Sequence, residues 1–537
     1  MKKLLYTAAA LLAMCCTTSC SKDWLETDST TSGSPQLIFS TIDNAELAVN
    51  GLARLMCMQH SYYGQGASGE GWIKYLFGNF PGQNFSVPRL TGWSSIMNMS
   101  YHQRNTSSYD SYGWYYYYRI IDNANMIIGN IDDVPTGGDP QIEARKTFIK
   151  AQALVYRAYG HFQLTQLYSH RWMDTNHGDA DGVIIRTESS TEGAPLSKLS
   201  AVYTQVFDDL KAAIAAFESV PAQKRIFLSA PDLSVAQAIL ARAAITRADS
   251  RDDYELAAEM AAAARRGYPL MSVADYRADF ESPTSEWIWG SFASVDQNLQ
   301  YWSFQAQLAY NANTSRSRGY RHCISRELLE TFPDNDIRKN LFVHPAILGM
   351  TDAEFQKIVN QTTGQISDKK AIAAIDAYYA DRYAPASGSY YVAYEHRKFG
   401  CFGQPGVAYL NHIRSSEMVL LEAEAQCRLG NDPAAQALLV ELNATSQRDP
   451  DYTCTKTGDE LFEEIVRYRA LELWGEGFDW FDMKRWGKTL ERKSFKKGGN
   501  FASAMAVTVQ PDEANQWTWV IPEKETAYNT FLNEEAE

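Results

Sequence analysis

The chain has 537 residues, and its 45% hydrophobic content is normal for a folded globular protein. Its formal net charge is −14 at pH 7. Nucleic acid is therefore not an expected partner, because phosphate binding needs clustered Lys and Arg. After the first twenty residues no apolar run approaches the roughly 20 residues that cross a bilayer, so a membrane-spanning body is not expected either.

The N-terminal segment has the features of an export signal. Lys2 and Lys3 supply a positive start, and the apolar run Leu4 to Met14 has the length of a signal-peptide core. Small residues then lead into Cys20, a pattern typical of a lipoprotein signal. We expect residues 1–19 to be removed and Cys20 to carry the lipid. An ordinary secretory peptide or an N-terminal anchor helix is the alternative, although the run is too short to span a bilayer.

Residues 20–35 comprise the lipidated cysteine and a polar tether rich in Ser and Thr, a composition typical of flexible linkers. No Pro-rich or Gly-rich linker divides the chain after this point, so residues 36–537 are predicted to form one domain. Between 37 and 60 apolar residues recur at spacings of three and four, which predicts a helix.

The stretch 61–113 has no such periodicity and is rich in Gly, Ser, Asn and aromatic residues. Long irregular segments in large proteins often carry function. Trp93, Tyr101 and Tyr109 are its candidate binding residues, because aromatic rings present flat apolar faces on which sugar rings stack. The alternative is that these rings lie in the core or pack under loops.

Helical patterns dominate after residue 114. Apolar residues line one face of 114–130, 141–168 and 203–217. Two further segments read as helical hairpins. In 234–265 Ser234 is the expected N-cap, and in 413–445 a helix from Ile413 to Arg428 precedes a second one. Paired helices with small residues at such spacings resemble tetratricopeptide-like units, so a predominantly all-α scaffold is predicted.

The stretch 280–410 is mixed, with Gly, Pro and aromatic residues between short helical pieces. It contains a second group of candidate binding residues: Tyr301, Trp302, Asn313 and Arg316. A last strong helix is expected over 459–487, followed by short strands or a pinned extended segment after 495. The five cysteines after Cys20 are far apart and form no CxxC pair, so they predict neither a zinc site nor a disulfide framework.

The carboxylates of the last helix offer one catalytic hypothesis. Glu472, Glu476 and Asp482 lie near Arg469 and Arg485, and paired carboxylates serve as acid and base in glycoside hydrolysis. An arginine beside each acid favours the ionised form, which opposes a proton donor, so a scaffold role is preferred.

A polar loop with His170, His177, Asp174, Asp179 and Asp181 is the one candidate cation site, and its spacing matches no EF-hand. A solvated turn is the alternative. No G-x-S-x-G, P-loop, HExxH or GxGxxG motif occurs, and we expect no cofactor and no catalytic metal.

Several segments, in order, resemble the SusD/RagB-like lipoproteins of Bacteroidetes outer membranes. WYYYYRIIDNANMII at 114–128 and KAQALVYRAYGHFQLTQLY at 150–168 are similar to two consecutive family helices. YTQVFDDLKAAI at 203–214, IRSSEMVLLEAEAQCRLG at 413–430 and ELWGEGFDWFDMKRWG at 472–487 are similar to later ones. Trp519 to Pro522 resembles the closing element.

The resemblance implies a tetratricopeptide-like body with a shallow, loop-built binding face and no catalytic residues. It also implies a SusC-like TonB-dependent barrel as partner, over which the protein acts as a lid that delivers oligosaccharide. The same architecture with peptide cargo, as in the RagB branch, is the alternative. A secreted glycoside hydrolase is a third hypothesis, with Glu472 or Glu476 as its acids.

Overall fold

The computed structural model describes residues 35–60, 67–293, 301–512 and 517–533. The predicted signal peptide, Cys20 and nearly all of the tether lie outside these residues. Helices predominate in the described part, which confirms the all-α prediction. Within that part, none of the helices combines the length and the apolar character needed to cross a bilayer.

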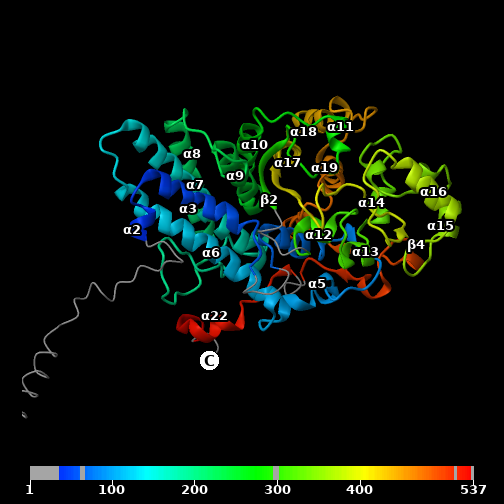
Figure 1. Cartoon of the computed structure of the whole chain (residues 1–537), viewed down its shortest axis with the longest axis horizontal. Coiled ribbons are helices and arrows are strands. Elements are labelled where there is room, and N and C mark those ends of the chain that lie inside the picture. Colours follow the sequence, from blue (N-terminus) through cyan, green and yellow to red (C-terminus); the bar gives the residue numbers. More distant parts are fainter. Residues whose placement is uncertain (1–34, 61–66, 294–300, 513–516, 534–537) are drawn as a thin grey trace, which may run out of the picture.

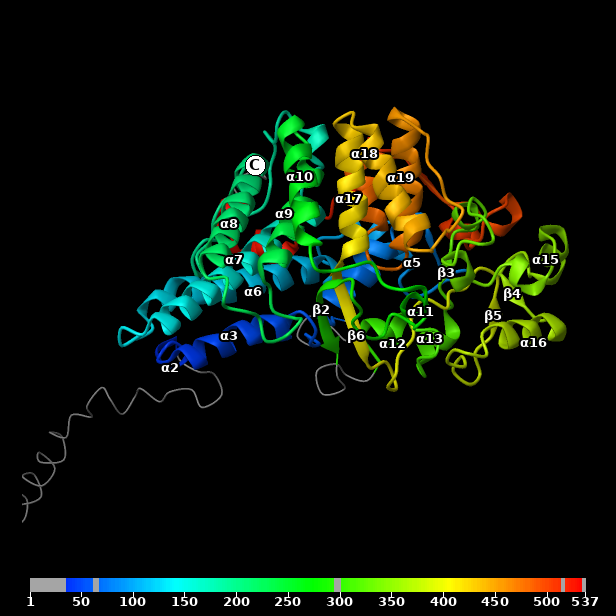
Figure 2. The same ribbon diagram turned by 90° about the horizontal axis from the view of Figure 1, so that it is seen from above.

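Antiparallel helices stand side by side as a row of hairpins, most clearly in Figure 2. α7 packs against α6 and α8, α9 packs against α8 and α10, and α17 packs against α10, α18 and α19. This arrangement confirms the tetratricopeptide-like prediction. The helices are α6 (Ser108–Asn130), α7 (Pro140–Tyr168), α8 (Leu199–Ser219), α9 (Leu233–Arg247), α10 (Arg251–Ala264), α17 (Ser415–Arg428), α18 (Asp432–Val440) and α19 (Gly458–Glu472).

Local signals explain where these helices begin and how closely they pack. Asp139 accepts a hydrogen bond from the backbone N–H of Gln141, with Pro140 in the first turn of α7. The N-cap of α9 is Asp232 and not Ser234 as expected; its carboxylate accepts from Val235 N at 3.1 Å. Buried alanines of α9, α10 and α17 allow the close approach of these helices.

Shorter elements surround the row. The remaining α-helices are α2 (Pro35–Ile38), α3 (Ile42–Leu55), α4 (Gly69–Trp72), α5 (Ser94–Met97), α11 (Val273–Tyr276), α12 (Phe304–Leu308), α13 (Ser315–Gly319), α14 (Arg326–Leu329), α15 (Asp352–Ile358), α16 (Lys369–Tyr378), α20 (Asp479–Trp486) and α22 (Glu523–Tyr528). Figure 1 places α15 and α16 at the far end of the molecule from α8.

Each strand in the described residues has one antiparallel partner. The pairs are β1 (Phe85–Ser86) with β3 (Cys323–Ile324), β2 (Trp287–Ala293) with β6 (Ala408–Arg414), β4 (Gln365–Ile366) with β5 (Tyr391–Val392), and β7 (Leu490–Glu491) with β8 (Thr508–Val509). The β2–β6 ribbon corrects one prediction: Ile413 and Arg414 end a strand, and helix α17 begins after them.

Two other boundaries differ from the sequence prediction. Helix α6 begins at Ser108, so Tyr109 and Tyr112 lie in a helix and not in the irregular segment. The helix expected over 459–487 is two helices, α19 and α20. Gly475 and Gly477 separate them with φ of +79° and +90°, values that favour glycine.

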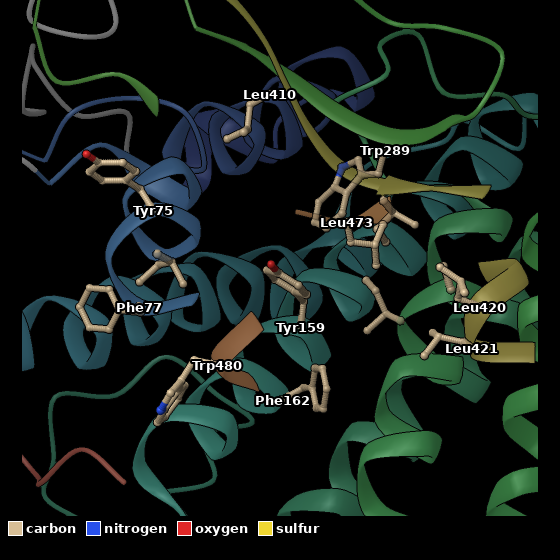
Figure 3. Close-up of a cluster of buried hydrophobic side chains, with 14 of the residues drawn as sticks. Tyr75, Phe77, Tyr159, Phe162, Trp289, Leu410, Leu420, Leu421, Leu473 and Trp480 are labelled. Atoms are coloured by element: carbon tan, nitrogen blue, oxygen red, sulfur yellow. The ribbon is translucent and has the colours of Figure 1, made fainter. Parts of the chain in front are cut away.

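The hydrophobic core joins the row to the irregular segments (Figure 3). Tyr159 and Phe162 of α7 lie in the centre of this view, and the Tyr159 ring meets the Trp289 ring of β2 edge to face at 5.3 Å. Tyr75 and Phe77 come from the fully buried π-helical turn η3 (Ile73–Asn79). The chain after 495 is pinned as expected: Trp519 N donates to Leu167 O and Val520 N donates to His102 O, both at 2.9 Å.

Candidate ligand-binding site

Five of the seven predicted binding residues come together in one place, the aromatic cluster. They are Trp93 just before α5, Tyr101 in the 3-10 turn η4 (Ser100–Gln103), Tyr109 in the first turn of α6, Trp302 just before α12, and Arg316 on α13. The first three come from the stretch 61–113 and the last two from the stretch 280–410. The fold therefore brings together two segments about 200 residues apart in the chain.

Trp72, at the end of α4, is the centre of the aromatic cluster. Its ring meets Trp93 edge to face at 5.2 Å and Trp302 edge to face at 6.3 Å. Tyr109 stacks with it at 6.5 Å. These are the arrangements that ring quadrupoles favour. Trp72 is only 3% exposed, so it organises the cluster from within.

Hydrogen bonding and stacking hold the tyrosines in place. The Trp93 indole N–H donates to the Tyr109 hydroxyl oxygen at 2.9 Å, and the Tyr101 ring stacks on Tyr109 at 5.5 Å. Burial raises the pKa of Tyr109 above its ordinary value. The Tyr109 hydroxyl therefore stays protonated at neutral pH and has a hydrogen to donate.

The members of the aromatic cluster differ in what they present to solvent. Trp93 is 3% exposed, and the Arg316 guanidinium lies over its ring at 3.9 Å from the centroid. Trp93 thus has no open ring face, and the role we assign to it is support of Arg316. Tyr101, Tyr109 and Trp302 are half-buried and keep part of their ring surface accessible.

Tyr301 and Asn313 lie beside the cluster without a ring contact to it among the described residues. Tyr301 is 51% exposed, and its carbonyl accepts from the Gln307 side chain. The backbone N–H of Asn313 donates to Gln404 Oε1 at 2.6 Å, which ties this segment to the loop before β6. Both residues are exposed, so they remain free to contact a ligand.

Sequence reasoning missed several residues here. Phe402 is 46% exposed, its ring stacks parallel to Phe292 at 6.2 Å, and Phe292 contacts Tyr409 at 4.8 Å. Phe292 and Tyr409 pair at one end of the β2–β6 ribbon and Phe402 lies in the loop before β6, and only their exposure in the folded chain marks them as candidates. Arg89 and Arg104 could have been found from the sequence, because both lie in the irregular stretch 61–113.

An open hollow of about 560 Å³ adjoins the aromatic cluster. Arg316 belongs to both, which makes the hollow and the cluster one continuous candidate site. The hollow is lined by Arg89, Gly92, Ser315, Arg316, Gly319 and Tyr320.

The carboxylates of α19 and α20 form a buried ion network instead of an open acid–base pair. Glu472 is fully buried and binds Arg338 and Arg414, while Glu476 binds Arg414 and Lys398. These cations outweigh burial: they hold the pKa of Glu472 well below its usual range and lower that of Glu476 to about 2. Both acids are therefore ionised and enclosed, which suits a scaffold.

The remaining acids of this group are paired in the same way. Arg469 donates to Asp482 at 2.7 Å and not to Glu472, while Arg485 donates to the other Asp482 oxygen at 2.9 Å. Arg469 and Asp482 also line a cavity of about 590 Å³ beside α19 and α20, and none of the seven predicted binding residues lines it.

The polar loop after α7 forms ion pairs of its own. Asp174 pairs with Arg171 and Asp179 with Lys198, while His177 Nδ1 lies within hydrogen-bond distance of Asp249 Oδ1, at 2.7 Å. No group of three or more His, Cys, Asp or Glu in the described residues is placed to hold a metal ion. The five cysteines of that part of the chain are free thiols.

Comparison with known proteins identifies the family. Residues 403–533 match the model of the SusD family, and residues 57–245 match a related SusD-like model described as starch-binding associating with outer membrane. The chain belongs to the SusD family. No curated protein matches it.

Solved structures share the fold of this SusD-family protein over most of its length. A SusD-like carbohydrate binding protein from Bacteroides vulgatus ATCC 8482 is 22% identical, with a TM-score of 0.72 over 92% of this chain and 98% of that chain. A SusD superfamily protein from Bacteroides thetaiotaomicron VPI-5482 is also 22% identical, with a TM-score of 0.68 over 91% and 98%. One from Bacteroides fragilis is 17% identical, with a TM-score of 0.68 over 92% and 100%. At such identities the likeness establishes the fold alone.

Proposed function

We propose that this SusD-family protein binds an oligosaccharide at the aromatic cluster and releases it unchanged. The observation that carries the proposal is the convergence of Trp302, Tyr101 and Tyr109 around Trp72, with polar groups at the edge. Flat ring faces stack on the apolar C–H faces of sugars, while hydroxyl and guanidinium groups bond sugar hydroxyls. The match to a family model described as starch-binding supports the same class of ligand.

We further propose that the protein is tethered to the outer-membrane surface through lipid on Cys20 and passes its ligand to a SusC-like TonB-dependent barrel. The lipoprotein pattern before Cys20 and the family membership support this location. The polar segment 20–35 would allow a large binding body to move while it stays attached.

Calorimetry of the mature protein against a panel of oligosaccharides and a panel of peptides tests the proposal. Saturable binding of a sugar, with no shortening of that sugar in the same tube by chromatography, is the expected result. Binding of peptides alone would favour the alternative cargo. Release of shorter sugars that stops on Glu472→Gln would instead favour the hydrolase alternative.

A further inference from the structure

Three arginines around the aromatic cluster lack a carboxylate partner among the described residues. They are Arg89, Arg104 and Arg316, and none of them forms an ion pair there. Other exposed or half-buried arginines of the described residues do, as Arg145 with Asp43 and Arg251 with Glu255 illustrate. In a chain with net charge −14, three cations grouped around one aromatic cluster and outside any ion pair among the described residues give this surface a local positive charge.

Aromatic rings hold these guanidinium groups by their flat faces. Arg316 lies 3.9 Å from the Trp93 centroid and 5.5 Å from that of Tyr320, and Arg104 lies 5.0 Å from that of Tyr101. Arg89 lies 5.5 Å from the Tyr390 centroid. A stacked guanidinium keeps its N–H edges available, and its position is set in advance. The arginines are thus prepared to donate paired hydrogen bonds at little entropic cost.

The adjoining hollow has the same character. Arg89 and Arg316 both line it, and no acidic residue is among the side chains that do. Because like charges disfavour an empty cationic hollow and an anion relieves that repulsion, the surface selects a negatively charged group. Carboxylate and sulfate both fit the planar, bidentate donor set of arginine.

We propose that the ligand of this site is an anionic oligosaccharide, whose carboxylate or sulfate groups bind Arg316 and Arg89 while its rings stack on the aromatic cluster. This inference rests on the proposed function and names the substrate class. It goes beyond glycan binding as such, because a neutral glycan would leave these guanidinium groups without a partner of opposite charge.

Matched ligands give the test. Oligosaccharides of the common uronic acids are compared with their carboxyl-reduced forms, and sulfated oligosaccharides with their desulfated forms, by calorimetry on the mature protein. We expect one acidic sugar to bind at least about tenfold more tightly than its neutral partner. The anionic group is identified by the pair of ligands, carboxylate or sulfate, that shows this difference in affinity.

Variants locate the effect. Arg316→Gln and Arg89→Gln should each weaken the acidic ligand about fivefold to tenfold and weaken its neutral partner by a clearly smaller factor. Arg266→Gln removes the same charge from an exposed position after α10, away from the site, and should change neither. Circular dichroism and thermal unfolding verify that each variant is folded. If Arg316→Gln does not fold, Arg89→Gln provides the test, because Arg89 is exposed.

The outcomes separate the two proposals. Equal or tighter binding of the neutral partners, or an equal effect of Arg266→Gln, would overturn the anionic-ligand inference and leave glycan binding standing. No binding by any sugar would contradict the proposed function itself, and with it this inference. Raising the salt concentration should weaken the acidic ligand and spare the neutral one, because exposed charges are screened.

Discussion

Arg414 Nη1 lies 2.7 Å from Glu472 Oε1, and both side chains are almost completely buried. This contact joins the end of strand β6 to the end of helix α19. Arg414 also donates to Glu476 and Glu286, so a single guanidinium binds three carboxylates. The residues that the sequence offered as an acid–base pair are therefore the ionic centre of the scaffold.

Replacing Arg414 by Met should strongly destabilise the fold. Removing one partner of a buried ion network leaves uncompensated charges, which costs about 3–5 kcal/mol of the free energy of unfolding. Urea unfolding measures this difference. Arg251→Met is the control, because the exposed pair of Arg251 with Glu255 is worth only about 0.5 kcal/mol. Similar losses in both variants would contradict a special role for Arg414.

The accessible aromatic side chains of Tyr301 and Trp302 should contribute to the affinity for the ligand. Tyr301→Ala and Trp302→Ala are each expected to weaken the glycan that binds best by about fivefold to tenfold, because a stacking contact contributes about 1 kcal/mol. Titration calorimetry reports this change. Tyr528→Ala, at a residue 86% exposed on α22, is the matched control and should bind normally. Unchanged affinity in both site variants would place the ligand elsewhere.

His322 should make the fold less stable in mild acid. It is buried and shares a 2.7 Å hydrogen bond with the Tyr75 hydroxyl, and burial lowers its pKa to about 3. Below pH 6.5 His322 becomes protonated in the unfolded chain but stays neutral in the folded chain. The free energy of unfolding that is present at pH 7 therefore decreases as the pH falls towards 3. The loss from this residue is about 2 kcal/mol at pH 5.

A variant isolates that contribution. His322→Gln keeps a polar group near Tyr75 but cannot titrate. Between pH 7 and pH 5 the wild type should lose about 2 kcal/mol more of its free energy of unfolding than the variant does. Parallel pH dependence of the two proteins, measured by urea unfolding, would rule out the buried neutral histidine.

Gly78 is required by close backbone packing. A Cβ there would lie 2.1 Å from the carbonyl oxygen of Gly477, in the turn between α19 and α20. Gly78→Ala should therefore destabilise the protein by about 3 kcal/mol in thermal or urea unfolding. Gly129→Ala is the matched control: nothing lies within 4 Å of its Cβ, and it should be neutral or stabilise helix α6 by about 0.5 kcal/mol. The reverse order would refute this packing argument.

Removal of the lipid anchor should separate binding from uptake. Cys20→Ala protein should keep its unfolding temperature and its glycan affinity, because Cys20 precedes the folded body. Cells that depend on this protein for growth on its glycan should nevertheless fail to grow, because the binding body is no longer held at the membrane. Normal growth with the variant would argue against an anchored lid.

Local patterns determined the helical scaffold. The spacing of apolar residues in 141–168 predicts α7 to within one residue of Pro140–Tyr168, because the buried face of an amphipathic helix places apolar residues at regular spacings in the sequence. The same logic failed at Ile413 and Arg414. These residues pair with β2, more than 100 positions earlier, and that partner overrides their helical appearance.

The candidate site was accessible to sequence reasoning only in part. Composition pointed to two aromatic, irregular segments, and to Trp93, Tyr101, Tyr109, Trp302 and Arg316 within them. The sequence by itself determined which segments lack helical periodicity and which residue types they offer. Only the tertiary structure decided that both segments meet at Trp72, that Arg316 covers Trp93, and that Arg89, Arg104 and Arg316 form no ion pair among the described residues. Such contacts join residues far apart in the chain, and no local pattern records them.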